Sequence, residues 1–201
     1  MTYGAFVHRA QVEKAVNDTL QKWFPDYLAE FRRQNNLSVA QLIEPRSYAV
    51  HTRFDNLVDD HLPAVVVISP GLDNGIKPYK SGSGLYTCSW SIGVGIIVSG
   101  NDWEDTAYRV GAYTSCIRAI LVQQSSLDGL AEQVSWRDES YDDHEDEDGR
   151  TLSAGVVSVG VIISRVVDDT AGPLVPGNTE TSWPATDVDM TIVRRPLTGN
   201  L

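Results

Sequence analysis

The chain is poor in the residues from which most catalytic and metal sites are built. Its 201 residues include only two cysteines and four histidines. Cys88 and Cys116 lie in apolar patterns with no cysteine or histidine at metal-ligand spacing nearby. We therefore expect buried free thiols, as in a reducing compartment, although the sequence leaves a disulfide between them open. No Gly-x-Ser-x-Gly sequence positions a serine nucleophile, so the residues predict no enzyme and no cofactor.

Basic residues and long apolar runs are also scarce. Lys and Arg total 16 against 27 Asp and Glu, which gives a formal net charge of −11. This balance argues against nucleic-acid binding, because such proteins gain affinity by neutralising phosphates. The longest apolar runs, residues 64–68 and 92–98, are far shorter than the ~18 residues needed to span a bilayer. Residues 1–10 do not resemble a signal peptide, so we expect a soluble protein that is not conventionally exported.

The negative charge is concentrated in one segment. Residues 138–148 read DESYDDHEDED, which is eight carboxylates in eleven residues, and without them the net charge would be −3. Strand patterns on both sides predict that this run is the tip of a β-hairpin. The candidate residues for facing a lumen or a partner are Asp138, Glu139, Asp142, Asp143, Glu145, Asp146, Glu147 and Asp148.

A calcium site of the EF-hand type does not fit this run. With Gly149 at position six of the loop, position one is His144 and position twelve is Gly155, where an acid is required at both. An adventitious divalent site at Asp142, Asp143 or His144 stays open, but a solvated or partner-facing tip is the favoured interpretation.

Two segments have helical periodicity. In residues 10–35 apolar residues recur every three or four positions, and Pro25 is expected to end one helix and begin a second. Residues 102–124 predict the principal helix, with a capping Asn101 or Asp102 and a buried stripe from Ala107 to Leu121.

The strand patterns lie between and after these helices. Residues 63–71 predict a buried strand, followed by an exposed loop over residues 72–84. Residues 86–98 alternate strictly with a two-residue period, residues 134–137 form a short strand, and residues 152–167 form a second long one. The predicted fold is α+β, a mixed and mainly antiparallel sheet packed against one long helix, with N-terminal helices.

The last part of the chain differs in character. Residues 1–167 are expected to form one domain, and residues 168–201 an extended arm rich in turn residues. Within the arm, Val188, Met190 and Ile192 alternate as one late strand and are candidates for a subunit contact. Strands of 13–16 residues would extend roughly 40–50 Å, more than the ~30–40 Å diameter of such a domain. They must therefore curl or project, and projection favours contacts between subunits.

The order of elements resembles that of the tail terminator proteins of long-tailed bacteriophages, especially those of actinobacteria. The segments that carry the resemblance are the Pro63-Ala-Val-Val-Val-Ile-Ser-Pro-Gly71 strand, the Leu85-Tyr-Thr-Cys-Ser-Trp90 segment and the Ser135-Trp-Arg-Asp-Glu-Ser-Tyr141 segment. It covers roughly residues 10–170, and the arm goes beyond it.

The resemblance implies a structural virion protein, assembled in the bacterial cytoplasm. A homohexameric ring would cap the tail tube at the head–tail junction, end polymerisation of the major tail protein and dock the neck or stopper protein of the head. The genome would pass through without specific binding. Two alternatives remain: another head–tail connector ring of the stopper type, and a small acidic metal-binding cytosolic protein.

Overall fold

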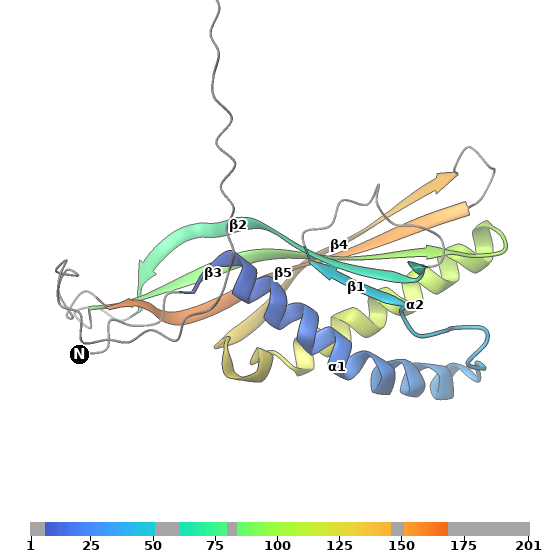
Figure 1. The fold of residues 1–201 in the computed structure, drawn as a ribbon, viewed down its shortest axis with the longest axis horizontal. Helices are drawn as coiled ribbons and strands as arrows, with labels where there is room; N and C mark the ends of the chain where they lie inside the picture. The colour runs from blue at the N-terminus through green and yellow to red at the C-terminus, as the bar shows by residue number, and fades with distance from the viewer. Residues whose placement is uncertain (1–6, 51–60, 80–83, 146–150, 169–201) are drawn as a thin grey trace, which may run out of the picture.

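The fold is α+β, as the sequence predicts. The computed structural model describes residues 7–50, 61–79, 84–145 and 151–168 (Figure 1). Helices α1 (Arg9–Asn35) and α2 (Trp103–Gln123) lie on one face of a five-stranded sheet, and a short turn of 3-10 helix, η3 (Leu127–Gly129), follows α2. No helix among the described residues is both long and apolar enough to cross a membrane.

The sheet is mainly antiparallel. Its strands are β1 (Ser47–Val50), β2 (Ala64–Pro78), β3 (Leu85–Ser99), β4 (Gln133–Glu145) and β5 (Thr151–Asp168), in the spatial order β1-β2-β3-β5-β4. Among the described strands, only β1 runs parallel to its neighbour. The long alternating strands β3 and β5 pair along almost their whole length at the centre of the sheet. This confirms the strands predicted over residues 86–98 and 152–167.

Helix α1 is continuous through Pro25, so the predicted break into two helices is wrong. Proline removes the N–H that would bond to the carbonyl of Gln21, and Gln21 is exposed, where water can satisfy that carbonyl. Leu20, Phe24 and Leu28 are fully buried on either side of the proline. Burial of this face therefore keeps the helix intact despite the unfavourable residue.

Replacing Pro25 by alanine should raise the free energy of unfolding by about 1–3 kcal/mol, because alanine restores the missing hydrogen bond and favours the helix. Urea denaturation of both proteins measures the difference. Asp26→Ala, at the next and exposed position, is the control and should change the free energy by only a few tenths of a kcal/mol. A Pro25→Ala value no larger than that control would contradict the expectation.

Helix α2 begins and packs largely as predicted. The Asp102 side chain caps it by accepting a hydrogen bond from the backbone N–H of Asp105 (2.8 Å). Its buried stripe begins at Thr106 rather than Ala107, which is exposed, and runs to Leu121. Tyr113 is fully buried and donates from its hydroxyl to the Ile43 carbonyl (2.6 Å). The helix is therefore held to the sheet by packing and to the connection after α1 by a hydrogen bond.

Strand β2 is longer than predicted. It continues to Pro78, so most of the expected loop over residues 72–84 is strand, interrupted by register shifts against β3 after Ile68 and after Asp73. At the first shift the fully buried Glu13 of α1 accepts a hydrogen bond from the backbone N–H of Ser69 (2.6 Å). Pairing with β3, rather than an apolar sequence, therefore keeps residues 72–78 extended.

Both cysteines are buried and free, as expected. Burial raises the pKa of the Cys116 thiol to about 12 and also raises the pKa of Cys88. Because the thiolate is the reactive form, neither side chain is suited to nucleophilic chemistry at neutral pH.

Candidate interaction surfaces

The acidic run is mainly strand and not a loop tip. Residues 138–145 continue β4 and pair with β5 one to one, from Asp138 opposite Ser158 to Glu145 opposite Thr151. Figure 1 shows the β4–β5 hairpin diverging from the helices at one end of the sheet. Asp146, Glu147 and Asp148 lie outside the described residues. The prediction of a hairpin is confirmed, but the predicted position of Asp138 to Asp143 at its tip is wrong.

A β-bulge decides which acidic residues face the helices. Trp136 pairs with Val159 and Asp138 with Ser158, so Arg137 is an extra residue in β4. A bulge of one residue exchanges the two faces for everything that follows it. Glu139 and Tyr141 therefore lie on the face of the sheet that carries α1 and α2, the helix-bearing face. Asp138 lies on the opposite face, which we call the open face. The described carboxylates of the run are therefore divided between the two faces.

On the helix-bearing face the acidic side chains have local partners. Glu139 accepts from the Arg118 guanidinium of α2 (2.8 Å) and from the Tyr141 hydroxyl, and Arg118 also lies over the Trp136 ring (5.8 Å). Partial burial and the hydrogen bond to Glu139 raise the pKa of Tyr141. Asp143 accepts from the Ser153 hydroxyl. The ion pair of Glu139 with Arg118 binds the hairpin to α2 and neutralises Glu139, whereas the bond between Asp143 and Ser153 lies within the hairpin.

On the open face the bulge residue Arg137 reaches across the sheet. Its guanidinium pairs with Asp73 of β2 and lies near the hydroxyls of Ser89 (3.3 Å) and Ser91 (3.4 Å) of β3. It passes over Gly160 of β5, where a Cβ would lie 2.7 Å from Arg137 Nη2. Glycine at this position therefore leaves the space through which Arg137 joins the two sides of the sheet.

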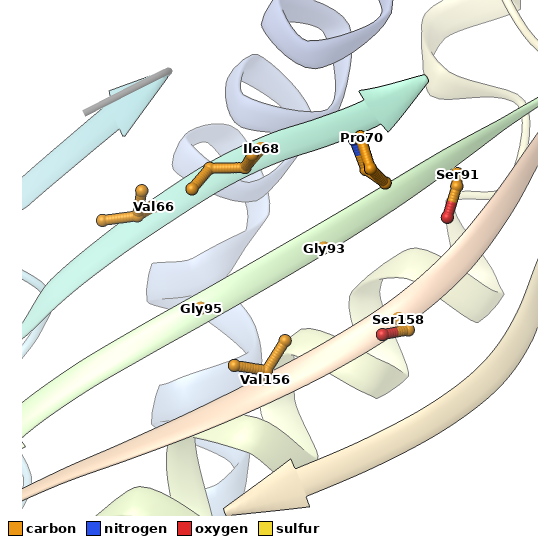
Figure 2. Close-up of a pocket in the computed structure, with 8 residues that line it drawn as sticks. All are labelled: Val66, Ile68, Pro70, Ser91, Gly93, Gly95, Val156 and Ser158. Atoms are coloured by element: carbon orange, nitrogen blue, oxygen red, sulfur yellow. The ribbon is translucent and has the colours of Figure 1, made fainter. Parts of the chain in front are cut away.

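Next to Ser91, which lies near Arg137, the open face is hollowed. Figure 2 shows the residues that line this hollow. Gly93 and Gly95 of β3 form a floor without side chains, and the groove has a volume of about 210 Å³. Most of its rim is apolar. Its lining residues, which define the open-face groove, are Val66, Ile68, Pro70, Ser91, Gly93, Gly95, Val156 and Ser158.

Within residues 7–50, 61–79, 84–145 and 151–168, no three His, Cys, Asp or Glu side chains lie close enough to hold a metal ion. Asp142 is exposed, and the side chain of His144 lies outside the described residues, as do Val188, Met190 and Ile192 of the arm.

Neither a family model nor a curated protein matches this chain. Function therefore has to be argued from the surfaces themselves.

Sequence reasoning did not identify the Arg137 bridge or the open-face groove. A signal for the bulge does exist: Val134 and Trp136 share one phase of alternation and Tyr141 has the other, which indicates an inserted residue between them.

Proposed function

We propose that the chain is a structural virion protein of the tail terminator type, which forms a ring at the head-proximal end of a bacteriophage tail tube. The observation that carries the proposal is a projection formed by three strands. At the end of the sheet opposite the hairpin, β2, β3 and β5 continue past the two helices (Figure 1). We call this part the three-strand projection. Leu72 and Ile76 of β2 are 42% and 51% exposed on it.

The three-strand projection supports contacts between subunits for two reasons. Exposed apolar side chains that lie close together typically mark interaction sites. In addition, β1 pairs only with Ala64 to Val67, so β2 has no outer neighbour beyond that point among the described strands. β4 has no outer neighbour in the same set. The two open edges are on opposite sides of the sheet. A contact that joins the β2 edge of one subunit to the β4 edge of the next is therefore head-to-tail, the arrangement that forms a ring when the rotation between subunits closes.

In this proposal the hexameric ring ends polymerisation of the major tail protein and provides the docking surface for the neck or stopper protein. The open face carries Asp138, and the hairpin carries the exposed Asp142. If these residues line the lumen, DNA can pass without binding, because like charge provides no release of counterions. No membrane partner and no catalysis are part of the proposal.

Negative-stain imaging and light scattering of the purified protein test it. We expect sixfold rings that bind the ends of isolated tail tubes. A stopper-type ring would instead bind the head connector and leave tail-tube ends free. A protein that stays monomeric at all concentrations, alone and with tail tubes, would contradict both ring proposals.

A double substitution tests whether the three-strand projection forms the contact between subunits. Leu72→Lys with Ile76→Lys should abolish the rings while leaving the circular dichroism spectrum unchanged, because both side chains are exposed and lysine disfavours strand-edge association. The control is Val39→Lys, at a 66% exposed apolar residue outside the strands, which should leave the rings intact. Rings that survive the double substitution would show that the three-strand projection does not form the contact between subunits.

A further inference from the structure

We propose that the open-face groove is the docking site of the chain's own C-terminal segment, residues 187–193, which places Val188, Met190 and Ile192 in the groove. This proposal goes beyond ring formation and does not depend on it. It combines an apolar hollow on the sheet with the one segment of the C-terminal arm that alternates like a strand.

The groove suits a row of medium-sized apolar side chains. Its floor at Gly93 lacks a side chain, and a Cβ built there would be 3.7 Å from the Ile68 carbonyl oxygen and 3.9 Å from Val156 Cγ1, which are ordinary contacts. The volume of about 210 Å³ exceeds that of an engineered cavity of ~150 Å³ that binds benzene. There is therefore room for at least one side chain the size of Met190 or Ile192. An alternating segment presents such side chains on one side and its polar residues on the other.

The length of the arm allows the chain to reach its own groove. From Asp168, at the end of β5, back to Ser158 at the groove is ten residues of strand, or about 33 Å. Residues 169–186 provide 18 residues of connection, which can span up to about 60 Å. A segment tethered within reach of its site has an effective concentration in the millimolar range. The chain's own arm is therefore the preferred occupant over a second copy.

Charge favours the same placement. Arg194 and Arg195 directly follow the apolar residues of the segment. On the sheet, Asp138 lies opposite Ser158, a lining residue of the groove, and its side-chain hydrogen bond is to the neighbouring backbone N–H of Glu139 (2.8 Å). Asp138 is thus an exposed carboxylate beside the groove that can attract the arginine pair.

Hydrogen exchange on the full-length protein tests whether the groove is occupied. The amides of residues 187–193 should exchange at least about tenfold more slowly than in an unstructured peptide of the same sequence. Gly93→Val fills the groove and Met190→Asp removes an apolar side chain from the segment, and each should abolish the protection. Gly111→Ala, a glycine substitution on α2 with nothing within 4 Å of the new Cβ, should leave it unchanged. Exchange at the unstructured rate, or protection that survives both substitutions, would overturn the proposal.

A cross-link identifies which chain supplies the segment. Ser158→Cys combined with Met190→Cys should form a disulfide within one chain under mild oxidation, because docking brings the two positions together. The two native thiols are buried and should not compete. A band of monomer size that runs faster on a non-reducing gel is the expected result. A disulfide-linked dimer would overturn the assignment to the chain's own arm.

Discussion

Phe24→Ala should lower the free energy of unfolding by about 3–5 kcal/mol, the usual range for truncating a fully buried phenylalanine. Phe24 is completely buried on α1, with its ring centroid 6.2 Å from that of Tyr113 on α2 and 6.3 Å from that of Tyr48 on β1. One side chain thus joins both helices and the edge of the sheet, so its truncation removes packing from three elements at once.

Urea denaturation is the measurement, with Phe31→Ala as the matched control. Phe31 is on the same helix but only half-buried, and its truncation should cost about 1–2 kcal/mol, since less apolar surface returns to water. Similar losses for the two variants would contradict the central position of Phe24. An unchanged slope of the denaturation curve would show that the comparison concerns stability and not the unfolded state.

Gly155→Val should lower the free energy of unfolding by about 3 kcal/mol, the upper end for inserting volume into a packed interior. Gly155 of β5 lies directly beneath α2. A Cβ at this position would be 2.4 Å from Thr114 Oγ1 and 3.0 Å from Val110 Cγ2. Because both are buried side chains of a helix packed on the sheet, α2 has to move away.

A second substitution shows whether this contact is the cause. Thr114→Ala removes the Oγ1 atom and should recover part of the loss when combined with Gly155→Val, so that the two changes are not additive. Gly111→Ala is the control of opposite sign. Nothing lies within 4 Å of its Cβ, and alanine in a helix should stabilise the protein by about 0.5–1 kcal/mol. Additive effects of Gly155→Val and Thr114→Ala would contradict the proposed clash.

The elements that the sequence predicts well are those whose own residues bury their faces. β3 and β5 alternate apolar side chains that enter the core, and α2 presents a continuous apolar stripe, so periodicity alone identifies them. Local composition opposes the observed structure at Pro25 and in residues 72–78. In both places distant partners decide the outcome: the core around Phe24 in one case, and pairing with β3 in the other.

The candidate site was predictable only in outline. The hairpin follows from two strand patterns with turn residues between them, but the length of β4 depends on pairing with β5, which the acidic sequence does not indicate. The faces of its carboxylates depend on one inserted residue, Arg137. The open-face groove depends on Gly93 and Gly95 of β3 lying beside residues of β2 and β5. Such a juxtaposition of three strands is set by tertiary structure.

The contact between Arg137 and Asp73 gives the sheet a mechanical property. It connects β4, which belongs to the acidic hairpin, to β2, which belongs to the three-strand projection, across β5 and β3. A force on the hairpin is therefore transmitted to the projection by this side chain as well as by the hydrogen bonds between neighbouring strands. With Arg137→Ala, only the hydrogen-bond ladders of the central strands would couple the two ends of the molecule.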